Sequence, residues 1–125
     1  MKTVTVGWFE IPVSDMDRAI AFYIKVFKVE INKQKFGGTE MGWFPFDGKG
    51  KGAPGTLIKS GDHYKPSTEG VLVYFSSADV TNELNRIEKA GGKILQVKTQ
   101  ISEDHGYMAL FLDSEGNRVA LHSQK

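Results

Sequence analysis

The sequence predicts an α+β domain built from two similar units, each with one strand, one helix and three further strands. Two observations lead to this prediction. The same order of elements appears twice along the chain, and an offset of 64 residues brings the two halves into phase. The 125 residues suffice to bury one hydrophobic core, so one domain is expected. The units are expected at residues 1–60 and 70–125, joined by a linker at 61–69 that contains glycine, proline and small polar residues.

The first unit opens with a mostly apolar run at 4–13, which indicates a strand buried largely on both sides, with one polar interruption at Glu10. Ser14 or Asp15 can cap the following helix, expected over about residues 15–27, because their side chains accept hydrogen bonds from the free amides of a first turn. The apolar stripe of that helix is Met16, Ile20, Tyr23 and Phe27. Further strands are expected at 29–36, 41–46 and 55–60.

The second unit repeats this order. The apolar and aromatic run at 71–75 predicts a strand, Asp79 is the expected cap of a second helix, and Gly91-Gly92 is its expected end. The apolar stripe of this helix is Val80, Leu84 and Ile87. Further strands are expected at 93–97, 107–112 and 118–122, the last two joined by a turn at 113–117.

The offset of 64 residues superposes equivalent features of the two units. It places Asp15 on Asp79 and puts the buried stripes of the two helices in phase. Outside the helices it aligns Gly42 with Gly106, Gly52 with Gly116, and Leu57 with Leu121. Identities this scattered are near chance, so the repeated order of elements carries the argument. A coincidental run of α+β elements is the alternative.

Composition excludes several classes of function. Lys+Arg 16 nearly balance Asp+Glu 15, and the charges are interspersed, so no basic stripe for nucleic acid is expected. The absence of cysteine excludes disulfides and thiolate chemistry and is compatible with a reducing compartment. The chain enters its first strand without the apolar run of a signal peptide or membrane helix, so a cytoplasmic protein with no membrane partner is expected.

Two segments resemble the vicinal oxygen chelate superfamily, which includes glyoxalase I, bleomycin-resistance proteins and extradiol dioxygenases. Residues 8–23, reading WFEIPVSDMDRAIAFY, resemble its opening, and residues 113–118, reading DSEGNR, resemble its closing turn. The resemblance covers essentially the whole chain. It implies two βαβββ modules forming a curved, cup-shaped mixed sheet with the helices on its outer face, and a homodimer.

The resemblance also locates the positions at which metal-binding members of that family hold their ion. Counting from the two motifs, these positions hold Trp8, Thr56, Leu72 and Ala120 in this chain. None offers an imidazole, carboxylate or thiolate, and a threonine hydroxyl alone cannot hold a divalent cation. We therefore expect that the protein holds no metal ion and no cofactor. For the same reason we expect no glyoxalase I activity and no ring-cleaving dioxygenase activity.

The same resemblance, combined with the alternation of side chains along a strand, predicts the lining of the cup. The predicted ligand-binding residues are Trp8, Glu10, Thr56, Ile58, Leu72, Tyr74, Ala120 and His122. This lining is mostly apolar and aromatic, with a few polar groups that can orient a small organic ligand. For Trp43, packing in the core is favoured over stacking on a ligand.

These features predict a metal-independent small-molecule-binding protein of the glyoxalase and bleomycin-resistance type, for example one that sequesters an aromatic drug or metabolite. One alternative is a lyase or isomerase that uses Glu10 and His122 as catalytic base and acid. A structural role for each of these two residues is favoured over a catalytic one. Another alternative is a metal-dependent glyoxalase-like enzyme with relocated ligands. The sequence leaves open whether the cup is formed within one chain or across two.

Overall fold

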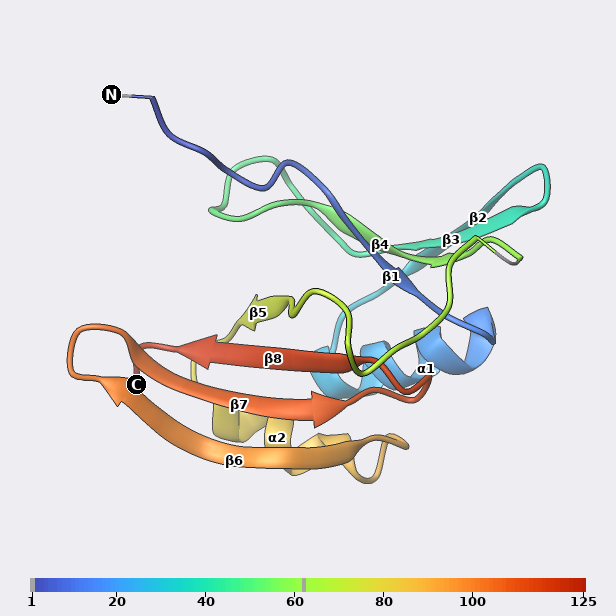
Figure 1. The fold of residues 1–125 in the computed structure, drawn as a ribbon. Coiled ribbons are helices and arrows are strands. Elements are labelled where there is room, and N and C mark those ends of the chain that lie inside the picture. The colour runs from blue at the N-terminus through green and yellow to red at the C-terminus, as the bar shows by residue number, and fades with distance from the viewer. Residues whose placement is uncertain (1, 62) are drawn as a thin grey trace.

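The computed structural model describes residues 2–61 and 63–125, so Asp62 of the predicted linker lies outside the described residues. Over these residues the chain forms two βαβββ modules, as predicted (Figure 1). The first contains β1 (Phe9–Pro12), α1 (Met16–Phe27), β2 (Asn32–Phe36), β3 (Thr39–Trp43) and β4 (Gly55–Lys59). The second contains β5 (Tyr74–Ser76), α2 (Val80–Ile87), β6 (Lys93–Ser102), β7 (Gly106–Leu112) and β8 (Arg118–Ser123).

Each module forms its own four-stranded mixed sheet, with the strand orders β1-β4-β3-β2 and β5-β8-β7-β6. The first strand of each module runs parallel to the last, and the other neighbours are antiparallel. Within the described residues the two sheets are separate, and β1 and β5 each lie at an edge of their sheet. Within one chain the predicted cup is therefore present as two open halves.

The ends of several strands differ from the prediction. The first strand was expected at 4–13, but β1 spans only Phe9–Pro12, because β4 pairs with just these four residues. Val4 and Val6 before it are 96% and 69% exposed. The strand expected at 71–75 is Tyr74–Ser76, and the strand expected at 93–97 continues to Ser102. The apolar residues predicted where the strands lie in the sequence, but the length over which each strand pairs with its neighbour determines where it begins and ends.

The helix termini follow the predicted capping. Asp15 accepts a hydrogen bond from the Arg18 amide, and Asp79 accepts one from the Thr81 amide. The helix α2 ends at Ile87, and the amide of Gly92 donates to its carbonyl. A Cβ atom on Gly92 would lie 2.5 Å from the Leu112 carbonyl oxygen, so only glycine fits where the chain turns back.

The 64-residue offset holds for the first strands, the helices and the last strands, but not for β3 and β7. Gly42 pairs with Leu57, whereas Leu121, the equivalent of Leu57, pairs with Ala109. The structural equivalent of Gly42 is therefore Ala109. The predicted alignment of Gly42 with Gly106 is wrong. The connection between β7 and β8 is shorter than that between β3 and β4, and this difference shifts the register.

One hydrophobic core joins the two modules. Figure 1 shows α1 under the first sheet and close to the strands of the second. The Phe22 ring of α1 lies 6.0 Å from the Phe111 ring of β7, and the Tyr23 ring lies 6.1 Å from the Phe75 ring of β5. Fourteen buried residues from both helices and both sheets form this core, which positions the modules relative to each other.

A second connection between the modules is the closing turn, which we define as residues 113–117. The buried carboxylate of Glu115 accepts hydrogen bonds from the Ser14 and Asp15 amides at 2.9 and 2.8 Å. Arg18 donates from Nε to the same carboxylate at 2.7 Å. Burial raises the pKa of Glu115, but the hydrogen bonds from Arg18, Asp15 and Ser14 outweigh it and hold the pKa below its ordinary value.

The other side chains of the closing turn also contact the first module. The Tyr23 hydroxyl donates to Asp113 at 2.8 Å, and the Asn117 amide group donates to the Pro12 carbonyl at 2.7 Å. Burial, and then the charge of Asp113, raise the pKa of Tyr23 well above its ordinary value. The closing turn thereby fixes the end of β1 and the start of α1 from the opposite module.

We predict that Glu115→Gln destabilises the protein, because a neutral amide has one oxygen to accept bonds and cannot neutralise Arg18. Hydrogen bonds to a charged group contribute about 1.5–3 kcal/mol, so a loss of about 2 kcal/mol is expected. Chemical denaturation monitored by circular dichroism measures this loss. Glu103→Gln, in an exposed turn, is the control and should change little. Equal stability of both variants would contradict the role of Glu115.

The same carboxylate predicts a dependence of stability on pH. Because the pKa of Glu115 is lower in the folded state, its contribution is complete above its ordinary pKa of 4.5 and is lost as the pH falls through the folded value. The free energy of unfolding of the wild type should therefore fall more steeply than that of Glu115→Gln as the pH is lowered below 4.5. Parallel pH profiles for the two proteins would refute this assignment.

Candidate functional site

The register of the first sheet shows which side chains face the helices and which face away. Phe9 and Leu57 point toward the core, and a Cβ on Gly42 would meet side chains of α1. Glu10 pairs with Thr56, which also pairs with Trp43, so these three lie together on the opposite face. We call this the helix-free face of the first sheet, with the members Trp8, Glu10, Met41, Trp43, Thr56 and Ile58.

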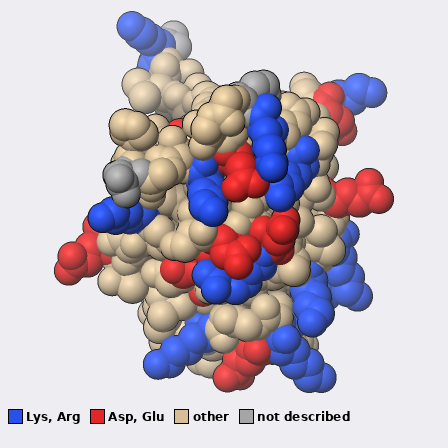
Figure 2. Space-filling model, turned by 90° about the vertical axis from the view of Figure 1, so that its right-hand side faces the viewer, with Lys and Arg blue, Asp and Glu red and all other residues tan. Residues whose placement is uncertain are grey.

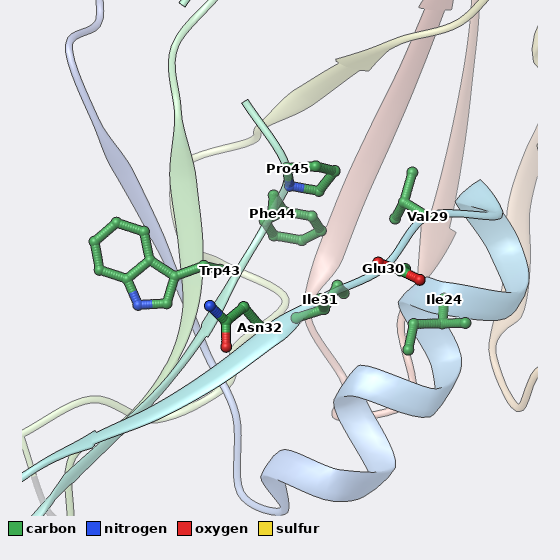
Figure 3. A pocket seen from close by; sticks show the side chains of 8 residues that line it. All are labelled: Ile24, Val29, Glu30, Ile31, Asn32, Trp43, Phe44 and Pro45. Carbon is green, nitrogen blue, oxygen red and sulfur yellow. The ribbon is translucent and has the colours of Figure 1, made fainter. Parts of the chain in front are cut away.

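The two tryptophans of this face pack against each other. The rings of Trp8 and Trp43 lie 5.0 Å apart with an interplanar angle of 66°, an edge-to-face arrangement. Figure 3 shows the Trp43 indole on the side of its strand that faces away from α1, whereas Phe44 points toward the helix. Sequence reasoning favoured the core for Trp43 and so missed a member of this face. Its alternation with Gly42, which faces α1, is the signal that could have placed it.

The hydrogen-bonding groups of this face are incompletely satisfied. Thr56 is 0% exposed, and its Oγ1 has no hydrogen-bond partner in the described residues. The same is true of Trp43 Nε1, so the two buried side-chain polar atoms identified without a partner both belong to this face. Glu10 is exposed beside them. The face therefore combines aromatic surface, one carboxylate and two unused polar groups.

The second sheet presents an equivalent helix-free face. Tyr74 pairs with Ala120, and Ser76 pairs with His122, while Phe75 points into the core. Tyr74 is 50% exposed, and Ala120 is fully buried. His122 Nε2 lies 2.6 Å from the His105 carbonyl oxygen. Because a carbonyl can only accept, Nε2 carries the proton and Nδ1 is the nitrogen left for another partner.

The predicted site residues thus fall into two groups. Trp8, Glu10, Thr56 and Ile58 belong to the first sheet, and Leu72, Tyr74, Ala120 and His122 belong to the segment around β5 and to β8. Among the described residues, no hydrogen bond or ion pair joins Glu10 to His122. The acid and base of the alternative enzymatic prediction therefore lie on different sheets within one chain.

A cleft of about 680 Å³ lies between the two edge strands and is lined by members of both groups. Trp8 lines it from the first module, and Leu72 and Tyr74 line it from the second. The aromatic rings at its floor are Phe9, Phe27, Phe44 and Phe75. Three of the predicted residues are therefore brought together, in a mainly apolar space of a size suited to a small organic ligand.

A second, more open pocket of about 730 Å³ lies where the end of α1 meets β2 and β3 (Figure 3). Ile24 and Ile31 line it near the helix, while Trp43 and Asn32 lie on the side away from the helix. Asn32 pairs with Trp43 across the two strands. Trp43 and Asn32 therefore bound this pocket from neighbouring strands.

The donor set does not suit a metal ion. The positions predicted for metal ligands hold an indole, a hydroxyl, an isobutyl group and a methyl group. Over residues 2–61 and 63–125 there is also no group of three histidine, aspartate or glutamate side chains placed to hold an ion. Divalent cations require several such ligands to replace their hydration shell.

The charged residues of the first module lie mainly elsewhere. Lys33 bonds to Asp17 at 3.0 Å and lies 3.3 Å from Glu40, which is also 4.0 Å from Lys59. Figure 2, turned to the side at which β2 joins β3 and α1 begins, shows acidic and basic side chains side by side. That surface therefore has no patch of a single sign. No helix in the described part of the chain has the length and apolar character needed to cross a bilayer.

The two unclosed mixed sheets, each with one helix on one face, define the class of protein as a two-module α+β fold of the vicinal oxygen chelate type. The model of the glyoxalase, bleomycin resistance protein and dioxygenase superfamily matches residues 5–121. The chain therefore belongs to this superfamily. A search among curated proteins found no match.

Solved structures with the same fold include proteins of several kinds. TnmS3, an antibiotic-binding protein from Streptomyces sp. CB03234, is 22% identical with a TM-score of 0.70, and the match covers 100% of this chain and 99% of that one. A glyoxalase, bleomycin resistance protein and dioxygenase domain from Frankia sp. EAN1pec is 15% identical with a TM-score of 0.74, over 99% and 100%. Glyoxalase I from Zea mays is 18% identical with a TM-score of 0.69, and the match covers 94% of this chain but only 45% of the maize protein. At these identities the likeness establishes the fold alone.

Proposed function

We propose that this protein binds a small, largely aromatic organic molecule without the help of a metal ion. The observation that carries the proposal is the chemistry of the helix-free faces and the cleft between them. Aromatic and aliphatic side chains make up most of the cleft lining, and Tyr74 and Ser76 add hydroxyl groups. Glu10 adds a carboxylate on the adjoining helix-free face, and the positions predicted for metal ligands offer no metal-binding set. Apolar contact contributes about 25 cal/mol per Å² removed from water, which suffices for binding without a metal.

Sequestration of a drug or metabolite is the specific form of this proposal. TnmS3, which shares the fold over its whole length, is an antibiotic-binding protein. Glyoxalase I of Zea mays shares it over less than half of its length. The neighbours therefore span a binding protein and an enzyme, and the donor set of this chain favours binding. The lack of cysteine is compatible with action in the cytoplasm.

We also propose that the functional unit is a homodimer in which a second copy completes the site. In one chain the two sheets end at the unpaired edges of β1 and β5, and their helix-free faces belong to separate sheets. The segments next to these edges carry exposed apolar side chains, including Val4 at 96%, Val6 at 69% and Val71 at 93%. Exposed edges and valines are surfaces that proteins normally cover.

Thermal denaturation with a panel of aromatic antibiotics and metabolites tests ligand binding, in parallel with EDTA, zinc, nickel and manganese. We expect at least one aromatic compound to raise the melting temperature equally with EDTA and with each metal. A ligand at about 100 times its Kd adds about 2.7 kcal/mol to the free energy of unfolding. Stabilisation that appears only with a metal, or metal retained in stoichiometric amount through dialysis, would overturn the proposal.

Light scattering coupled to size exclusion tests the dimer. We expect twice the mass of one chain for the wild type and the mass of one chain for Val71→Lys, because a buried lysine at this edge would lack a partner. Val97→Lys, also at an exposed valine but on β6, is the matched control and should remain dimeric. A wild-type protein that is monomeric at all concentrations would contradict the dimer.

A further inference from the structure

The two unpartnered polar atoms lie on neighbouring strands of one face. Thr56 on β4 and Trp43 on β3 are direct partners in the antiparallel register, so their side chains project on the same side of the sheet. Thr56 is fully buried. The indole Nε1 can only donate a hydrogen bond, and the threonine hydroxyl can donate or accept.

Leaving such groups buried without a partner is unfavourable. A hydroxyl or indole N–H that leaves water without forming a hydrogen bond loses its hydration and gains nothing in return. Valine has nearly the same shape as threonine and would fill the position of Thr56 without a hydroxyl to satisfy. Two such atoms on paired residues of one face therefore point to a group outside the free chain that satisfies them.

The neighbouring side chains do not supply that group. Glu10 pairs with Thr56 in the parallel register, and Asn32 pairs with Trp43, but both are exposed and neither bonds to the unpartnered atoms. The missing partner has to accept hydrogen bonds, because Nε1 can only donate. An oxygen atom on a ligand meets this requirement.

Trp8 covers part of the Trp43 ring. The two rings pack with 5.0 Å between their centroids, and Trp8 is 38% exposed. Trp8 precedes β1, so its side chain can move without breaking the pairing of that strand with β4. A flat ligand that displaces the Trp8 ring would take over its contact with Trp43 and reach the Thr56 hydroxyl.

The charge on this face selects against an anionic oxygen. The charged side chain on the helix-free face is that of Glu10. The nearby lysines Lys33, Lys35 and Lys59 project from the helix-facing side of the same sheet. Lys51 lines the adjoining cleft from the loop between β3 and β4. A carboxylate beside Thr56 would meet Glu10 without a cation on the sheet to compensate, whereas an uncharged oxygen would not.

We infer that Thr56 and Trp43 donate hydrogen bonds to an uncharged acceptor oxygen, such as the carbonyl of a flat conjugated ligand that displaces the Trp8 ring. The inference rests on the proposed function and adds to it a class of ligand and two residues that determine specificity. It makes separate predictions for the free protein and for the complex.

For the free protein, Thr56→Val should raise the melting temperature, because it removes an unsatisfied hydroxyl and retains the shape of the side chain. Thr39→Val is the matched control on the same sheet. Its hydroxyl lies 3.4 Å from the Ser60 hydroxyl, so the control variant should be unchanged or less stable. A lower melting temperature for Thr56→Val would show that the hydroxyl has a structural partner and would overturn the inference.

For the complex, 9-fluorenone and fluorene serve as a matched pair of probes, because they have nearly the same shape and only fluorenone has a carbonyl. The chain contains two tryptophans, both at this site, so quenching of tryptophan fluorescence reports binding directly. We expect fluorenone to bind at least about tenfold more tightly than fluorene, as one or two additional hydrogen bonds would give. Thr56→Val and Trp43→Phe should each remove most of this difference, and fluorenone-4-carboxylate should bind more weakly than fluorenone.

The outcomes separate this inference from the function on which it rests. Equal binding of fluorenone and fluorene to the wild type would overturn the role of Thr56 and Trp43, while metal-independent binding of aromatic molecules would stand. Binding of neither probe would count against both. A difference between the probes that persists in Thr56→Val and in Trp43→Phe would place the carbonyl elsewhere and would also overturn the inference.

Discussion

The relative position of the two modules depends on the closing turn at residues 113–117. Its side chains bind the end of β1 and the start of α1 in the first module. Glu115 accepts bonds from two backbone amides and from Arg18, and Asp113 and Asn117 bind Tyr23 and the carbonyl of Pro12. The Tyr23–Asp113 bond is buried, and the Glu115 side chain is fully buried although its partner Arg18 is exposed. Water therefore screens these contacts less than it screens an ion pair between two exposed side chains. Together with the shared aromatic core, they give the two modules one relative position.

That position determines where a ligand can bind. Because both sheets turn their helix-facing sides toward one core, the opposite faces carry the aromatic and polar side chains that remain available. The edges of β1 and β5 meet at the cleft, where Trp8, Leu72 and Tyr74 come together. One face of each sheet thus packs in the core, and the other face is the one to which the proposed function assigns ligand recognition.

The sequence predicted the two modules, both helix caps and the shared face of Glu10 and Thr56 because these features depend on local signals. Asp15 and Asp79 cap helices through their own first turns, and alternation along β1 and β4 places Glu10 and Thr56 on one face. Features that depend on distant partners were missed. The sequence favoured the core for Trp43, and its register with β4 places it on the helix-free face instead. The short extent of β1 follows from the four residues that pair with β4. The turn at 113–117 was predicted, but its bonds to residues about a hundred positions earlier were not.

The claim that the closing turn holds the modules in one arrangement is tested most directly by measuring a distance between them. The chain contains no cysteine, so spin labels on Gln34→Cys in β2 and Gln100→Cys in β6 report only on these two positions. Double electron–electron resonance on labelled protein diluted with unlabelled chain excludes distances between copies. A single narrow distribution at neutral pH is the predicted result. A broad distribution, or two populations, would show that the modules move independently and would contradict the account.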